Sequence, residues 1–220
     1  MVNKTTFKQY LLEAEEKMPR ARVLMELFAS IEDGEFTKDG SELENIYGFG
    51  CANKNLKSLI GSPKKIEGEF DCSNNPELTS LIGAPQQGVT DFSCCNNPKL
   101  ESLIGAPREV RGFYCTKTAI TSLIGAPQKI TGWFECKNNP GLISLSKIHL
   151  YIHEIDGILN FYGSPIKSNI LGLLKIKKCI GIRFNDEKLS RIISKYLPEG
   201  NITDCIDDLI DNGFAEYATW

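Results

Sequence analysis

The chain has 220 residues, a formal charge of −3 at pH 7, 41% hydrophobic residues, eight cysteines and two histidines. This length accommodates one extended domain with end caps. No apolar stretch is long enough to cross a bilayer, and the charged, amphipathic N-terminus does not match a secretory signal, which argues against a membrane-spanning or secreted protein. The cysteines are therefore expected as small buried hydrophobes rather than as disulfides.

Residues 1–46 are predicted to form an N-terminal helical cap. Apolar positions recur at helical spacing over 5–17 and 20–31, and Pro19 suits the start of the second helix. Asp33-Gly34 is expected to end that helix.

A pentapeptide then recurs within residues 47–145. It reads Leu-Ile-Gly-Ser-Pro at 59–63 and Leu-Ile-Gly-Ala-Pro at 81–85, 103–107 and 123–127, and its leucines lie 22, 22 and 20 residues apart. A degenerate copy returns at Leu145. A short fixed period predicts a solenoid of stacked coils, because one coil cannot bury its own apolar face.

Each repeat also places a phenylalanine two positions before a cysteine. Residues two apart on a strand share a face, so both side chains are expected to point inward. The five pairs are Phe49/Cys51, Phe70/Cys72, Phe92/Cys94, Phe113/Cys115 and Phe134/Cys136.

These repeats resemble the leucine-rich repeat family in an irregular, short-repeat form, through the pattern Phe70-x-Cys72-x-x-Asn75-x-x-Leu78-x-x-Leu81 and its copies. The resemblance implies an α/β fold, a leucine-rich-repeat-like solenoid with a stacked parallel sheet. It also implies that Asn75, Asn97 and Asn139 hydrogen-bond the backbone where the chain leaves each strand. Thr118 and Lys54 depart from the asparagine pattern, which is expected to weaken this ladder.

Residues 146–184 are predicted to be degenerate repeats that continue the sheet, with strand character over 148–153 and 178–184 and a loop at 163–165. Residues 185–220 are predicted to form a C-terminal helical cap, with helices over 186–196 and 203–213. Covering the open ends of a solenoid is a structural requirement, so these caps need no further function.

The outward residues of the predicted strands indicate a binding surface. They are acidic at one end and aromatic at the other, and we expect a partner to bind Glu69, Asp71, Asp91, Ser93, Tyr114, Trp133 and Glu135. Exposed aromatic residues are enriched at binding hot spots, and carboxylates favour a basic protein surface over nucleic acid. The alternative is that the charges only keep the sheet soluble and that Trp133 packs beneath a C-terminal element.

Residues that would support catalysis are few. His149 and His153 are four apart but lack a His-Glu-x-x-His motif, and Glu154 is the one obvious third ligand for a metal. Cys205-Ile-Asp207 resembles the Cys-x-Asp motif of bacterial leucine-rich-repeat ubiquitin ligases, but the roughly seventy residues after the clear repeats are too few for that family's catalytic domain. We therefore expect no enzyme, metal or cofactor.

The opening residues 6–14 resemble the capsid-targeting peptide of internal head proteins of large tailed phages, which a maturation protease cuts after Leu/Ile-x-Glu. The triplet Leu11-Leu12-Glu13 would place the cut between Glu13 and Ala14 and remove residues 1–13. The repeats and residues 195–200 also resemble uncharacterised leucine-rich-repeat proteins from such phages and from some bacteria.

Together these observations predict a non-enzymatic, phage-encoded solenoid that binds a bacterial host protein with a basic surface, in the host cytoplasm, as an inhibitor of a host defence protein. The first alternative is a structural or internal protein packaged in the virion. The second is a small enzyme using His149, His153 or Cys205. Neither nucleic acid nor a membrane is expected as a partner.

Overall fold

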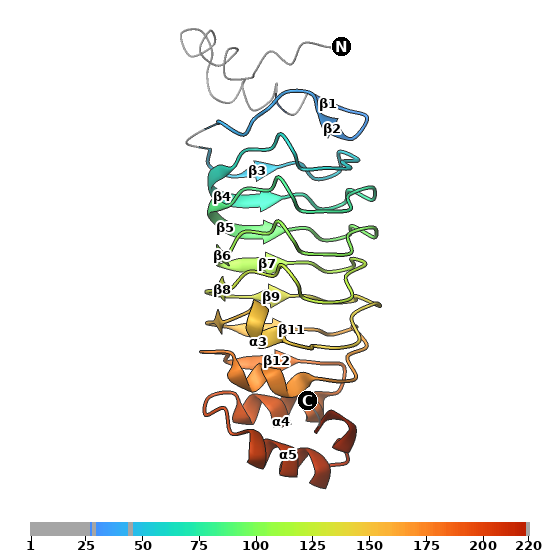
Figure 1. Ribbon diagram of the computed structural model, residues 1–220, viewed down its shortest axis with the longest axis vertical. Coiled ribbons are helices and arrows are strands. Elements are labelled where there is room, and N and C mark those ends of the chain that lie inside the picture. Colours follow the sequence, from blue (N-terminus) through green and yellow to red (C-terminus); the bar gives the residue numbers. More distant parts are fainter. Residues whose placement is uncertain (1–26, 28–29, 44–45, 219–220) are drawn as a thin grey trace.

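The computed structural model describes residues 27, 30–43 and 46–218, which form an elongated stack of coils (Figure 1). The helices predicted over 5–17 and 20–31 lie outside the described residues, except at Leu27, which is helical and buried, and at residues 30 and 31. There the prediction is wrong, because Ile31–Glu32 (β1) and Glu35–Phe36 (β2) pair as an antiparallel hairpin. Asp33 and Gly34 have φ angles of 50° and 82°, the left-handed pair that a tight hairpin turn requires, so they join two strands instead of ending a helix.

Parallel strands from successive coils form two sheets along the stack. The larger sheet has the order β12-β11-β9-β7-β5-β4-β3, and the smaller has the order β10-β8-β6. The seven strands are β3 (Phe49–Gly50), β4 (Lys65–Asp71), β5 (Gln87–Ser93), β7 (Gly112–Tyr114), β9 (Phe134–Glu135), β11 (Ile158–Asn160) and β12 (Gly181–Arg183). The three are β6 (Glu109–Val110), β8 (Lys129–Ile130) and β10 (Glu154–Ile155). All neighbours in both sheets are parallel, which confirms the predicted solenoid with a stacked parallel sheet.

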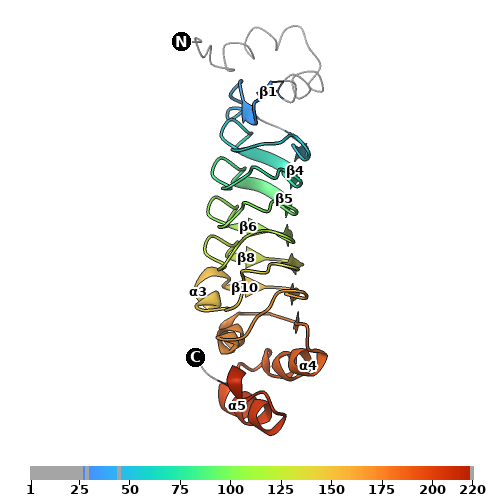
Figure 2. The same ribbon diagram turned by 90° about the vertical axis from the view of Figure 1, so that its right-hand side faces the viewer.

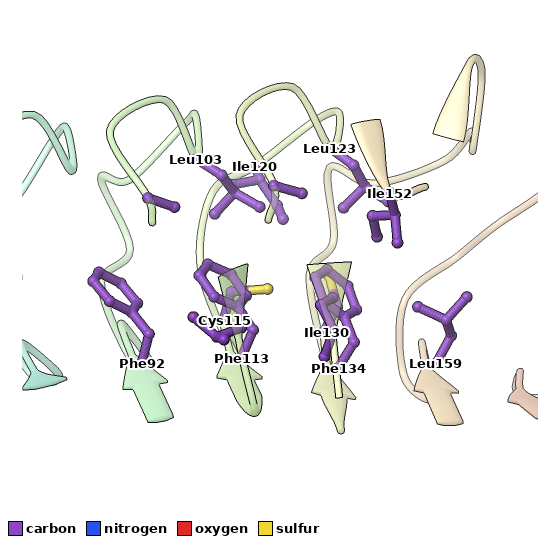
Figure 3. Close-up of a cluster of buried hydrophobic side chains, with 14 of the residues drawn as sticks. Phe92, Leu103, Phe113, Cys115, Ile120, Leu123, Ile130, Phe134, Ile152 and Leu159 are labelled. Atoms are coloured by element: carbon purple, nitrogen blue, oxygen red, sulfur yellow. The ribbon is translucent and has the colours of Figure 1, made fainter. Parts of the chain in front are cut away.

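The inward phenylalanines and cysteines of the repeats fill the interior, as predicted. Both columns are buried over their whole length, from Phe49 to Phe134 and from Cys51 to Cys136. Neighbouring rings stack with their centroids 5.2 to 6.0 Å apart, and Figure 3 shows three of them. Offset aromatic pairs of this kind contribute about 0.5–1.5 kcal/mol each beyond the area they bury.

The last two coils build the same interior from a different sequence pattern. Leu159 pairs with Phe134 and with Ile182, so aliphatic residues occupy the phenylalanine position of these coils. The rings follow two residues later, at the cysteine position, where Phe161 and Phe184 lie 6.2 Å apart. Each of these coils still places two buried apolar side chains inward, so the sheet continues through β12 although the Phe-x-Cys motif is lost.

Buried asparagines tie each coil to the one before it. Asn75 Oδ1 accepts hydrogen bonds from the Lys54 N–H (3.0 Å) and the Leu56 N–H (2.9 Å), and Asn97 Oδ1 accepts one from the Asn75 N–H (2.8 Å). The Nδ2 groups of Asn75 and Asn97 donate to cysteine carbonyls in their own coil and in the preceding one. The asparagine ladder implied by the resemblance is therefore present.

Hydroxyl groups continue this ladder where asparagine is missing. The Thr118 N–H and hydroxyl both donate to Asn139 Oδ1, at 2.7 and 2.8 Å. In the next coil the Ser164 hydroxyl accepts from the Asn139 N–H and donates to the Cys136 carbonyl, both at 3.0 Å. Where the resemblance implies a weaker ladder, Thr118 is thus tied to the following coil by its N–H and its hydroxyl, and Ser164 extends the ladder beyond the last asparagine.

The C-terminal region adds short helices to the coils. The strand predicted over 148–153 is wrong, because Ile148–Tyr151 (α3) is a one-turn helix that follows Lys147 in the left-handed conformation (φ 59°). It packs against the 3₁₀ helix Ile170–Lys175 (η1). No described helix is both long enough and apolar enough to cross a membrane.

The predicted C-terminal helices are confirmed as Glu187–Tyr196 (α4) and Ile202–Asp211 (α5), followed by the 3₁₀ turn Ala215–Tyr217 (η2). Asp186 is the N-cap of α4, where its side chain accepts from the Leu189 N–H, and Asn201 is the N-cap of α5, where its side chain accepts from the Asp204 N–H. Helix α4 covers the last strand: Ser194 Oγ accepts from the Ile182 N–H (3.1 Å) and Ser190 Oγ from the Phe184 N–H (2.8 Å). These serines satisfy backbone donors that a further strand would otherwise bind.

We expect Asn97→Ala to lower the free energy of unfolding by about 2–4 kcal/mol, because it removes the acceptor of the buried Asn75 N–H and the side-chain donor to the Cys94 carbonyl, while the Cys72 carbonyl keeps only its bond from Asn75 Nδ2. Urea denaturation followed by circular dichroism measures this loss. The matched control is Asn96→Gly, since the exposed Asn96 side chain donates to the Asn74 side chain and the left-handed backbone at Asn96 tolerates glycine. Equal losses in the two variants would contradict the role of the buried ladder.

Candidate partner-binding face

The outward side chains of β4, β5, β7 and β9 form one continuous surface, called here the sheet face. One row of direct cross-strand neighbours contains Asp71, Ser93, Tyr114 and Glu135. A second row lies two residues earlier along the chain and contains Glu69, Asp91, Gly112 and Trp133, the last of which directly precedes β9 and accepts from the Phe113 N–H (2.8 Å). Because residues two apart on a strand share a face, the structure brings all seven predicted residues together on this surface.

The acidic end of the sheet face holds the carboxylates whose charge is least compensated. The Asp71 side chain accepts a hydrogen bond from the Ser73 N–H at 2.9 Å. Among the described residues no cationic side chain pairs with Glu69 or Asp71, whereas the Asp91 carboxylate forms an ion pair with Arg111. The carboxylates without an ion pair therefore lie on β4, where Glu69 is also close enough to Arg111 to interact with its charge.

Tyr114 lies along the sheet over Gly112. A Cβ placed on Gly112 would stand 2.7 Å from the Tyr114 hydroxyl oxygen and 2.9 Å from Cε2, and it would also touch the Asp91 carboxylate. Glycine therefore makes the room in which the ring lies. Partial burial, and then the nearby Asp91 charge, raise the pKa of Tyr114 above its ordinary value.

Trp133 stands at the other end of the face with 47% of its surface exposed, so it does not pack beneath a C-terminal element. Beside it lies a shallow, open hollow of ≈ 670 Å³ lined by Cys95, Asn96, Tyr114, Thr116, Lys117, Trp133, Glu135 and Lys137. The Glu135 carboxylate accepts hydrogen bonds from Asn160 Nδ2 (3.1 Å) and pairs with Lys137 Nζ (2.8 Å). The hollow thus offers two aromatic surfaces beside a carboxylate that already has a cationic partner.

Sequence reasoning missed the cations that compensate this face. Strand alternation places Lys137 outward, two residues after Glu135. Arg111 directly precedes β7, and it reaches Asp91 only through its long side chain. Ser93 lies on the face as predicted, and its hydroxyl is bonded to the Ser73 hydroxyl at 2.7 Å. Ser73 is buried, although strand alternation predicts that its side chain points outward.

The residues considered for catalysis lie in different surroundings. His149 Nδ1 is buried without a hydrogen-bond partner, while the exposed His153 lies after α3 with Nε2 3.2 Å from the Leu150 carbonyl. No group of histidine, cysteine and acidic side chains in the described part of the chain is arranged to hold a metal ion. Burial raises the pKa of the Cys205 thiol to about 11, so this cysteine is protonated at neutral pH. Glu13 and Ala14 lie outside the described residues.

Comparison with known proteins gave no matching family model, no matching curated protein and no matching solved structure. The sequence and the geometry of the solenoid therefore carry the functional argument.

We expect Gly112→Ala to lift the Tyr114 ring off the sheet, because the new Cβ would occupy the space of its hydroxyl and Cε2. Loss of burial should lower the pKa of Tyr114 towards its ordinary value of 10.0. An NMR titration of tyrosine ¹³Cζ signals, assigned with Tyr114→Phe, measures this change. The control is Gly50→Ala, since a Cβ at Gly50 would meet no atom within 4 Å; an unaltered Tyr114 pKa in Gly112→Ala would contradict the packing described.

Proposed function

We propose that this chain is a leucine-rich-repeat protein that acts without catalysis, by binding another protein through its sheet face. The observation that carries the proposal is the exposed Trp133 beside the half-buried Tyr114, held in register on a rigid parallel sheet. Tryptophan and tyrosine are the residues most enriched at binding hot spots, because they supply large contact areas with few rotatable bonds.

The charges of the sheet face favour a partner with a basic surface. Glu69 and Asp71 have no cationic partner among the described residues, so a lysine or arginine of the partner would gain an ion pair without displacing one. Asp91 and Glu135 are already paired, and we assign them the role of holding Arg111 and Lys137 in place. Phosphates of a nucleic acid would meet the carboxylates of β4, which argues against such a partner.

The proposed source is a tailed phage and the proposed partner a protein of the bacterial host, with a defence protein as the specific candidate. Support comes from the resemblance of residues 6–14 to a capsid-targeting peptide cut after Glu13. A protein trimmed to begin at Ala14 and injected with the DNA would reach the host cytoplasm early in infection. An internal virion protein is the alternative, and high copy number in purified particles would favour it.

The role of the sheet face can be tested by affinity capture from bacterial lysate with mass spectrometry. We expect the full-length protein to retain a partner that the variant Asp71→Lys/Tyr114→Ala/Trp133→Ala loses, while the melting temperature changes little because Trp133 is exposed and neither Tyr114 nor Asp71 is part of the core.

The matched control is Glu199→Lys/Ile210→Ala, which reverses one charge and removes one exposed apolar side chain on the C-terminal cap. Capture that survives in the sheet-face variant, or that is lost equally in the cap control, would refute binding through this face. Substituting His149, His153 and Cys205 by alanine should leave capture intact.

A further inference from the structure

The second residue of each pentapeptide points out of the solenoid. Ile60, Ile82, Ile104 and Ile124 are 67%, 55%, 50% and 43% exposed, whereas the leucine before each of them is buried. The turns that carry them stack directly, since Gly83 abuts the backbone of Leu59 and Ile60, and Gly105 and Gly125 abut the coils before them in the same way. These four side chains therefore form a continuous row along one edge, called here the isoleucine ridge.

The solenoid itself does not require isoleucine at these positions. The turn is held by other groups: a serine hydroxyl two residues earlier accepts from the isoleucine N–H, at 3.1 Å for Ile60 and 3.2 Å for Ile82 and Ile104. The glycine that follows has a φ angle of 100° or 101° in the first three turns, and the alanine or serine after it is buried. Single exposed apolar residues are ordinary, but a contiguous apolar row on a surface marks an interaction site.

Exposed cations border one side of the ridge. The residues four positions after the isoleucines are Lys64, Gln86, Arg108 and Gln128. The Gln86 N–H donates to the Lys64 carbonyl and the Gln128 N–H to the Arg108 carbonyl, so these residues lie on neighbouring coils. The next column is Lys65, Gln87, Glu109 and Lys129, paired through the small sheet and the long strands. These two columns hold four cations and one carboxylate, in a chain whose formal charge is −3. On the other side of the ridge, the residues three before each isoleucine are Lys57, Thr79, Glu101 and Thr121, whose formal charges sum to zero.

We propose that the isoleucine ridge binds an acidic amphipathic helix of another protein. Neighbouring isoleucines are one coil apart, about 4.8 Å, which is close to the 5.4 Å pitch of an α-helix. An apolar helix stripe laid along the ridge therefore meets one isoleucine per turn, and acidic residues beside the stripe face Lys64, Arg108 and Lys129. A second copy of this chain fits less well, because pairing two ridges antiparallel would bring their cationic columns together.

The helix α3 lies at the C-terminal end of this row of turns (Figure 2), and its Leu150 is 56% exposed. Leu150 extends the apolar edge by one coil. The edge ends there, because the following coil has the 3₁₀ helix η1 in place of a Leu-Ile-Gly turn. A helix of about four turns would cover the row from Ile60 to Ile124.

The proposal can be tested with two synthetic helical peptides of eighteen residues. Both carry leucine at i, i+3, i+4 and i+7 positions; one has glutamate beside the stripe and the other has lysine. Fluorescence anisotropy with the full-length protein should show binding of the glutamate peptide only, weakening as salt is raised. Ile82→Ser/Ile104→Ser should weaken it by about tenfold or more, since two half-exposed isoleucines lose their burial against the peptide.

Matched variants make the outcome specific. Ile210→Ser removes an apolar side chain of similar exposure from α5 and should leave the affinity unchanged, as should Trp133→Ala on the sheet face. Circular dichroism melting curves should show that the ridge variant folds like the wild type. Equal affinity of the ridge variant, or binding of the lysine peptide as tightly as of the glutamate peptide, would overturn the proposal. A dimer in sedimentation velocity that disappears in the ridge variant would assign the ridge to a second copy and overturn it as well.

Discussion

Each coil of this solenoid depends on the next coil for the partners of its buried backbone groups. The Asn75 amide reaches back to the Cys51 carbonyl, and the Asn97 side chain accepts from the Asn75 N–H. A shift of one residue between two coils would break these bonds and would also turn the phenylalanines outward, since side chains alternate along a strand. The buried ladder and the aromatic stack therefore fix one register, and that register also fixes which outward side chains meet on the surface.

A structure that depends on neighbouring coils has a problem at its ends, where the neighbour is missing. At the C-terminal end, helix α4 replaces the missing strand with two hydroxyl acceptors, Ser190 and Ser194, placed one helical turn apart. Helix α5 then packs on α4 and exposes Asp204, Asp207 and Asp211 beside the single apolar side chain of Ile210. An edge strand closed in this way presents no free row of donors to another chain, so binding by strand addition at this end is disfavoured.

Much of this arrangement could be predicted from spacing alone, because the repeats place chemically similar residues at equal intervals. The inward columns and the two terminal helices follow from period, alternation and capping residues, whereas the asparagine ladder is implied by the resemblance to leucine-rich repeats. Other features depend on three-dimensional contacts that have no fixed spacing. The aromatic ring moves from the position of Leu159 to that of Phe161, which keeps the interior apolar but changes the sequence pattern, and α3 follows a left-handed Lys147 that no motif indicates.

The candidate site was predictable to the same extent. Strand alternation placed Tyr114 and Trp133 on one face correctly, because their neighbours Phe113 and Phe134 must be buried. It did not reveal the compensation of Asp91, since Arg111 reaches that carboxylate through a side chain long enough to cross between strands. Nor did it reveal the ridge, because the isoleucine next to a buried leucine in a turn has no alternation to indicate its direction.

The two surfaces differ in how they use the repeat, and this difference bears on what each can recognise. Along the ridge the same residue returns in four coils, which matches a partner with a regular rise of its own. Along the sheet face the equivalent position changes from Asp71 to Ser93, Tyr114 and Glu135, although the residues buried behind it stay the same. The core places no demand on these outward positions, so their variety provides a non-repeating pattern of charge and aromatic surface. Such a pattern distinguishes one coil from the next and can fix the position of a partner along an otherwise uniform stack.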